Sequence, residues 1–174
     1  MSTSPPEVAQ CPIFQDLAPH ELGQVVELLE DVSFKAGEVI LREGHSTQHL
    51  WIIVRGRCEV AKSAKDGSQR QLAILEPGSV FGEMSFFRSA PHSASVRAVS
   101  DGKALRLSRN RYDQLLVHGP SAAHKIAIST AIILSERLRR MDDWTCDMIE
   151  RNGATNQREE WREFRSKLYT DWQF

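Results

Sequence analysis

Short apolar runs separated by glycines dominate the middle of the chain, from Gly37 to Leu107. The runs are rich in valine, isoleucine and leucine and read EVIL, LWIIV, CEVA, QLAIL, SVF, SVRAV and ALRL in chain order. The Asp66-Gly67 pair between two of them is the strongest hairpin signal, because glycine adopts a positive φ at no steric cost. Short strands at nearly regular spacing are typical of an all-β barrel or sandwich.

A helical pattern precedes this region. Residues 1–12 include a Ser/Pro-rich opening and are expected to form a flexible N-terminal segment. A short amphipathic helix is then predicted from Pro19 to Glu30, where apolar residues recur at helical spacing; they are Leu22, Val25, Val26 and Leu29.

The pattern becomes helical again after the predicted strands. One short helix is predicted over Arg109–Val117, where Gly119-Pro120 ends it. A long helix is predicted from Ser121 to about Glu150 by an apolar stripe, whose members are Ala127, Ile133, Leu134, Leu138, Met141 and Met148. A terminal amphipathic helix is predicted over Asn156–Trp172 by an aromatic face, whose members are Trp161, Phe164, Leu168 and Trp172.

Composition narrows the range of functions. The 174 residues suit one domain with an appendage. The 22 Lys and Arg residues are balanced by 23 Asp and Glu, so no basic surface is predicted that would by itself favour nucleic acid or anionic lipid. The three cysteines are far apart and lack metal-ligand spacing, which favours reduced thiols. No leader or membrane-spanning pattern is evident, so we expect a soluble, cytoplasmic protein.

Catalytic signals are missing from the pattern. The six histidines are scattered, and no metal site or nucleophile motif is predicted. Glu83 and His92 could form an acid–base pair, but such a pair needs further electrophilic help, so we expect a binding protein and not an enzyme.

The stretch VFGEMSFFRSAPHSASVRA at residues 80–98 carries the candidate chemistry. Gly82 is expected to lie between a strand and a short helical turn. Exposed backbone N–H groups at such a turn can bind an anion, and glycine allows the ligand to approach the backbone closely. The Glu83 carboxylate cannot favour that anion, so it is expected to accept hydrogen bonds from hydroxyl groups. Pro91 stiffens the return path, and Ser93 and Ala94 are small enough for the backbone to lie against a ligand. A ligand with phosphate at one edge and ribose at the other fits both requirements.

Five blocks of this sequence, in the same order, resemble the cyclic nucleotide-binding domain. That domain is shared by catabolite-activator-type regulators, cyclic-nucleotide-dependent kinase regulatory subunits and cyclic-nucleotide-gated channels. The blocks are IFQDLAPHEL, FKAGEVILREG, LWIIVRGRCEV, LEPGSVFGEMSFF and ALRLSRNRYDQLL. Gly82-Glu83, followed by Pro91, small residues and Val-x-Ala, resembles the family's phosphate-binding cassette.

The resemblance implies an α+β, mainly β fold: a double-stranded, jelly-roll-like β-roll flanked by helices. It divides the chain into the flexible segment 1–12, the β-roll with its flanking helices at 13–120, a long lid and dimerisation helix at 121–153, and a C-terminal amphipathic helix at 154–174. The implied ligand is cAMP or cGMP, with no further cofactor and no metal. The implied ligand-binding residues are Gly82, Glu83, Met84, Ser85, His92, Ser93, Ala94, Ile74, Val80, Leu138 and Met141.

The main departure from the family is His92, which stands where the family has an arginine that pairs with the phosphate. Histidine has a reference pKa of about 6.5 and offers at most one useful donor in this direction. If His92 faces a phosphate, binding should strengthen as the pH falls toward about 6. Arg88 or Arg97 could supply the missing charge, but strand alternation is expected to point Arg97 away from the pocket.

Three interpretations of the pocket remain open. It is a retuned cyclic nucleotide site, a site for another ligand such as a cyclic dinucleotide, or a non-binding pocket in a protein-interaction module. Arg137, Arg139 and Arg140 could meet the phosphates of a second ligand, which keeps the cyclic dinucleotide in view.

The resemblance also implies how a signal leaves the domain. In the family the helix after the barrel covers the base and forms a dimer seam, so we expect a homodimer through residues 121–150. The stretch after residue 150 is too short for a winged helix-turn-helix, so no DNA binding is expected, and no membrane association. The expected output is contact with an unknown effector protein.

Overall fold

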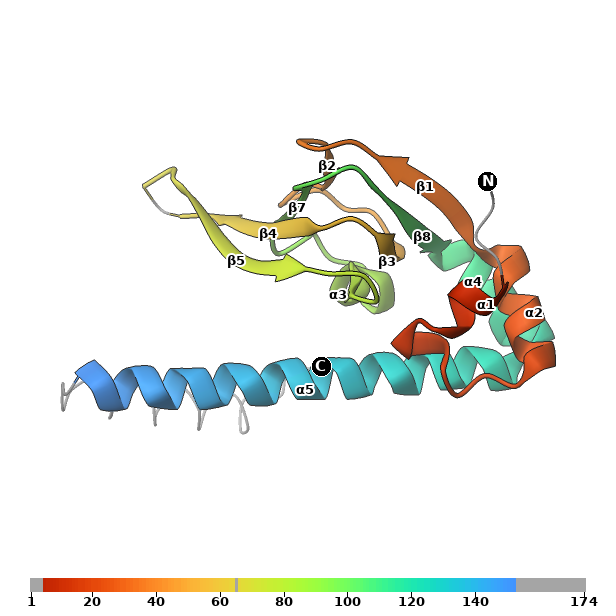
Figure 1. The fold of residues 1–174 in the computed structure, drawn as a ribbon. Helices are drawn as coiled ribbons and strands as arrows, with labels where there is room; N and C mark the ends of the chain where they lie inside the picture. Colours follow the sequence, from red (N-terminus) through yellow and green to blue (C-terminus); the bar gives the residue numbers. More distant parts are fainter. Residues whose placement is uncertain (1–4, 65, 153–174) are drawn as a thin grey trace. The chain divides into compact units, whose positions relative to one another are not determined.

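The computed structural model describes residues 5–64 and 66–152 (Figure 1). The chain divides into two compact units, the first ending at Thr130 and the second beginning at Ala131. The C-terminal helix predicted over Asn156–Trp172 lies outside the described residues.

Two four-stranded antiparallel sheets form the centre of the first unit (Figure 1). The strands are β1 (Glu30–Phe34), β2 (Val39–Leu41), β3 (His49–Arg55), β4 (Cys58–Ser63), β5 (Gln69–Leu75), β6 (Val80–Phe81), β7 (Ser95–Ala98) and β8 (Gly102–Ser108). One sheet has the order β1-β8-β3-β6 and the other β2-β7-β4-β5. This arrangement, flanked by helices, confirms the mainly β, α+β fold that the family resemblance implies.

Apolar side chains of both sheets form one buried cluster. Its members are Phe34, Leu41, Trp51, Ile53, Cys58, Leu75, Phe81, Val96, Ala98 and Ala104. Because successive side chains of a strand point to opposite faces, Val96 and Ala98 join this cluster while Arg97 between them is exposed. Strand alternation therefore orients Arg97 outward, as predicted.

The hairpin predicted at Asp66-Gly67 joins β4 to β5. Gly67 has a φ of +81°, which glycine adopts without strain. The Asp66 carboxylate accepts hydrogen bonds from the amide and the hydroxyl of Ser68, at 3.0 and 2.6 Å. An aspartate in this role is a common way to stabilise a turn.

Helices flank the sheets. They are α1 (Pro5–Ala9), a 3-10 turn (Pro12–Phe14), α2 (Pro19–Leu28), α3 (Glu83–Phe87), α4 (Arg109–His118) and α5 (Pro120–Asn152). The Tyr112 hydroxyl on α4 donates a 3.0 Å hydrogen bond to the Ala123 carbonyl, and Ile126 on α5 is fully buried. The first turns of α5 are thus part of the packed first unit.

Two segments differ from the expectations. Segment 1–12 was expected to be flexible, but Pro5–Ala9 forms α1, in which Val8 is only 1% exposed. Burying this side chain offsets the entropy of ordering the segment.

Strand β1 was not predicted by the apolar pattern, which placed its first residue, Glu30, in the preceding helix. Its five residues, EDVSF, are mostly polar, and only Phe34 is buried. Charged pairs with β8 hold it: Glu30 accepts a 2.9 Å hydrogen bond from Arg106 Nε, and Asp31 pairs with Lys103 Nζ at 2.7 Å. An apolar pattern carries no information about such pairs.

Glu21 links α2 to the start of α5. Its carboxylate accepts hydrogen bonds from the Ser121 hydroxyl at 2.6 Å, from Lys125 Nζ at 2.7 Å and from the Ala18 amide at 2.7 Å. The bond from Lys125 and then that from Ser121 are the main reasons why the pKa of Glu21 is lowered from 4.5 to about 2. The side chain is nearly buried, so these partners replace the water it has lost.

In the second unit α5 continues as a charged, amphipathic helix. Arg139 pairs with Glu136 at 2.7 Å and with Asp143 at 3.1 Å, and Arg140 pairs with Glu136 at 3.3 Å. This helix confirms the long one predicted from Ser121. Of the helices described here, none has the length and apolar character that crossing a bilayer requires.

The Glu21 network predicts how stability responds to acid. A depressed carboxyl pKa contributes stability that is present above the unfolded pKa and is lost as the pH falls through the folded pKa. The contribution of Glu21 should therefore disappear between about pH 4.5 and pH 2. We expect Glu21→Gln to lower the free energy of unfolding at pH 6, and the difference from wild type to shrink as the pH falls through this window. Urea unfolding at several pH values measures this; a difference that does not vary with pH would contradict the assignment.

Candidate functional site

The candidate site begins where β6 meets α3. Val80 and Phe81 pair with Ile52 and Trp51 of β3, and the chain then turns at Gly82 into α3. Gly82 caps the helix with φ and ψ of 79° and 1°, in the left-handed region. The short helical turn predicted after Gly82 is thus present.

Gly82 is required here by two separate constraints. Its positive φ is rarely adopted by residues with a side chain. In addition, a Cβ at this position would lie 2.5 Å from the His49 carbonyl oxygen and 3.2 Å from Trp51 Cδ1. The backbone of the turn therefore lies directly against β3, and no larger residue fits.

Two halves of the predicted cassette lie side by side. Glu83 in the first turn of α3 is only 6% exposed, whereas Met84 beside it is 61% exposed. The Ser93 hydroxyl, on the loop that returns toward β7, donates to Met84 Sδ at 3.8 Å. Ala94 is half-buried on the same loop. The segments after Gly82 and after Pro91 are therefore in contact, as a cassette built from both would require.

His92 points into the protein between two hydroxyl groups. Its Nδ1 lies 2.8 Å from the Ser85 hydroxyl on α3, and its Nε2 lies 2.7 Å from the Thr47 hydroxyl on the loop between β2 and β3. The residue is only 7% exposed. Its main chain is fixed to the same loop, because its amide donates to the His45 carbonyl at 2.9 Å and its carbonyl accepts from the Gly44 amide at 2.9 Å.

The environment of His92 favours the neutral ring. Burial is the main cause that lowers its pKa, and the neighbouring His45 lowers it further. The nearby arginines considered from the sequence, Arg88 and Arg97, have exposed side chains. Both ring nitrogens of His92 thus have partners within the protein.

The remaining predicted residues lie in different surroundings. Val80 is fully buried next to Gly82, and Ile74 on β5 is 41% exposed. Leu138 and Met141 belong to the part of α5 in the second unit, where their exposed fractions are 48% and 50%.

Sequence reasoning missed two residues of this region. Thr47 lies 45 positions from its partner His92, and a threonine in a polar loop gives no signal of such a contact. Trp51 stacks on Phe81 with ring centroids 5.9 Å apart and planes inclined by 10°. Its Nε1 is buried and, within the part of the chain that the structure describes, has no hydrogen-bond partner. The apolar run LWIIV predicted its burial but not its place beneath Gly82.

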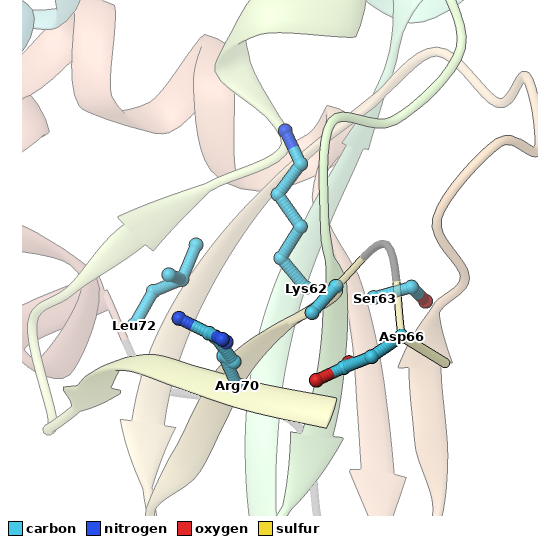
Figure 2. Close-up of a pocket in the computed structure, with 6 residues that line it drawn as sticks. Lys62, Ser63, Asp66, Arg70 and Leu72 are labelled. Atoms are coloured by element: carbon cyan, nitrogen blue, oxygen red, sulfur yellow. The ribbon is translucent and has the colours of Figure 1, made fainter. Parts of the chain in front are cut away.

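Two grooves lie elsewhere on the first unit. One has a volume of about 440 Å³ on the β4–β5 hairpin, where Figure 2 shows Lys62, Arg70 and Leu72 as neighbours. The cross-strand pair of Lys62 and Arg70 places two like charges opposite each other. The second has about 350 Å³ and is lined by residues that include Cys11, Arg55 and Gly78. Neither includes a cassette residue. Among the described residues, no group of His, Cys, Asp and Glu side chains is arranged to hold a metal ion.

The constraints on Gly82 predict the effect of adding one methyl group. We expect Gly82→Ala to lower the free energy of unfolding by about 1 to 3 kcal/mol, because alanine is strained at this φ and its Cβ meets the His49 carbonyl. Gly23→Ala is the matched control, since nothing lies within 4 Å of a Cβ at that helical position. The control should raise the stability by up to about 1 kcal/mol. Denaturant unfolding measures both, and equal effects would contradict the special role of Gly82.

Comparison with known proteins identifies the domain family. The family model described as the cyclic nucleotide-binding domain matches residues 31–118. The chain is 27% identical over 142 residues to the CRP-like cAMP-activated global transcriptional regulator of Mycobacterium tuberculosis, covering 82% of this chain and 62% of that protein. It is 34% identical over 131 residues to the cyclic AMP receptor protein of Thermus thermophilus, covering 75% of this chain and 59% of that protein.

A solved structure shows the same fold. The crystal structure of a cyclic nucleotide-binding domain from Methylobacillus flagellatus superposes with a TM-score of 0.75 and 25% sequence identity, covering 80% of each chain. This chain thus spans about six tenths of the length of the two curated relatives and most of that solved domain. The match over residues 31–118 includes both sheets and the whole cassette, and the chain belongs to the cyclic nucleotide-binding domain family.

Proposed function

We propose that this chain senses cAMP or cGMP by binding it at the cassette formed around Gly82–Ser85 and Ser93-Ala94. The observation that carries the proposal is the buried carboxylate of Glu83, which follows the left-handed Gly82 and lies in the turn that contacts Ser93. A carboxylate at 6% exposure next to a glycine-lined turn suits a ligand with sugar hydroxyls and an adjoining phosphate.

Each part of the cassette has a role in this proposal. Glu83 accepts a hydrogen bond from the ribose 2'-hydroxyl. Backbone N–H groups near Met84 and the small residues Ser93 and Ala94 hold the cyclic phosphate. Apolar contact with the base comes from Ile74, which is 41% exposed, whereas Val80 is fully buried and contributes only by packing next to Gly82. The names of the relatives, a cAMP-activated regulator and a cyclic AMP receptor protein, support the nucleotide class.

The proposed output is a change in the position of the C-terminal helices. Residues from Pro120 to Thr130 anchor α5 in the first unit, and the same helix continues into the second unit. In the proposal Leu138 and Met141 cover the bound base, and the apolar stripe of α5 pairs with a second copy of the chain. The signal then passes to an effector protein by binding alone, without chemical turnover. Free thiols at Cys11 and Cys58 fit action in the cytoplasm.

The role of Glu83 is tested by isothermal titration of nucleotide-free protein with cAMP and with cGMP. We expect saturable binding of at least one nucleotide, and Glu83→Gln should weaken it by about 10- to 100-fold, since a charge-assisted hydrogen bond contributes about 1.5 to 3 kcal/mol. The control is Glu76→Gln, the same change at an exposed glutamate in the turn before β6; this variant should bind the nucleotide like wild type. No saturation at millimolar concentrations of either nucleotide would reject the proposed function and direct the search to cyclic dinucleotides and protein partners.

The proposed dimer is tested by two glutamate substitutions on α5. Leu138→Glu places a charge on the apolar stripe and should convert a dimer to a monomer in light scattering after gel filtration. Arg140→Glu places the same side chain about 200° away around the helix and should leave the dimer intact. A wild-type monomer, or equal effects of the two substitutions, would argue against pairing through this stripe.

A further inference from the structure

A line of hydrogen bonds runs through the buried ring of His92. Thr47 Oγ1 lies 2.7 Å from Nε2, and Ser85 Oγ lies 2.8 Å from Nδ1. The Ser85 hydroxyl is also 3.2 Å from the Gly82 carbonyl, to which it donates. The four groups therefore form a continuous path from the β2–β3 loop to the cap of α3.

The direction of this path follows from counting protons. A hydroxyl group has one proton, and that of Ser85 is used on the Gly82 carbonyl. The contact between Ser85 and His92 then requires that Nδ1 carry the ring proton and donate it. In a neutral ring Nε2 is left as the acceptor, so Thr47 must donate to it. One tautomer satisfies every contact.

The path joins three segments that are far apart in the sequence. Thr47 belongs to the β2–β3 loop, His92 to the loop before β7, and Ser85 to α3. The main chain of His92 is already tied to the first of these segments through His45 and Gly44. Its side chain is what extends this connection to α3. Without the ring, Ser85 would keep only its local bond to the Gly82 carbonyl, three residues earlier in the chain.

The charge of the ring agrees with this arrangement. Burial is the main cause that lowers the pKa of His92, and His45 lowers it further. A neutral ring can accept from Thr47, whereas a doubly protonated ring cannot.

We propose that Thr47, His92 and Ser85 form a directed hydrogen-bond relay that positions the Gly82–Phe87 turn before any ligand arrives. Thr47 and His92 are positioning residues in this scheme, and neither pairs with the phosphate. This proposal takes only the identity of the ligand from the proposed function; the relay itself concerns the nucleotide-free protein. A phosphate in the cassette must then be held by backbone N–H groups and the Ser93 hydroxyl, without a charge from position 92.

The relay is tested in the nucleotide-free protein by two variants of Thr47. Thr47→Val keeps the shape of the side chain and removes the hydroxyl, whereas Thr47→Ser keeps the hydroxyl. The residue is exposed, so both variants are expected to fold. Nitrogen-15 spectra of labelled histidine at pH 7.5, with His92 assigned from the spectrum of His92→Asn, report which ring nitrogen carries the proton. Amide hydrogen exchange reports the stability of the turn.

We expect His92 to carry its proton on Nδ1 in wild type and in Thr47→Ser, and this preference to weaken in Thr47→Val, where Nε2 has lost its donor and only the Ser85 contact still favours it. Exchange of the Phe86 amide, which donates to the Gly82 carbonyl at 3.0 Å, should be about tenfold faster in Thr47→Val and unchanged in Thr47→Ser. A proton on Nε2 in wild type, or equal exchange in the two variants, would overturn the relay.

Ligand titration separates this result from the proposed function. If cAMP or cGMP binds wild type, Thr47→Val should weaken binding by about five- to tenfold and Thr47→Ser by less than about twofold. Equal affinities of the three proteins would show that the relay does not prepare the site and would overturn the proposal. If neither nucleotide binds wild type, the proposed function fails, while the tautomer and the exchange rates still decide the relay.

Discussion

The stacking of Trp51 on Phe81 is the contact on which the geometry of the site depends. Trp51 belongs to β3, which pairs with β8 on one side and β6 on the other, so its position is set by the centre of the sheet. Phe81 ends β6, and a Cβ at Gly82 would lie 3.2 Å from Trp51 Cδ1 and 2.5 Å from the carbonyl oxygen of His49 on the same strand. Only glycine fits at position 82. Core packing therefore fixes both where the strand ends and where the cassette helix starts.

The tryptophan also carries a cost that its apolar contacts must offset. An unsatisfied buried donor such as its Nε1 costs about 1 to 3 kcal/mol, whereas aromatic pairs contribute about 0.5 to 1.5 kcal/mol beyond the area they bury. Burial of the large indole surface supplies the rest. Arg106, placed 5.5 Å from the ring centroid, adds a cation–π contact and links this cluster to Glu30 of β1. Strand β1, which the apolar pattern did not predict, is thus linked to Trp51 through the charged pair of Glu30 and Arg106.

The sequence predicted those parts of the fold that depend on local chemistry. Apolar runs located seven of the strands, because each buries side chains in a common interior, and Asp66-Gly67 located the hairpin because its φ requires glycine. The helical turn after Gly82 was predicted too, but the left-handed φ of Gly82 was not, since glycine was expected there to let a ligand approach closely. Strand β1 was not, since its partners are charges on β8. Nor was the orientation of His92, because it depends on a hydroxyl 45 residues away and on another in α3.

Arginine and histidine at position 92 differ in the hydrogen bonds that they can make with the protein. An arginine carries five N–H donors and no acceptor, and its charge is permanent, so it cannot accept from Thr47 and is costly to bury without a counter-ion. A neutral histidine has one donor and one acceptor, which matches the two hydroxyl groups on either side of it. The substitution therefore exchanges a charge directed at a ligand for order within the protein. Under the proposed function, selectivity then depends on shape more than on charge, because the backbone N–H groups and the Glu83 carboxylate would discriminate between ligands without a cation at position 92.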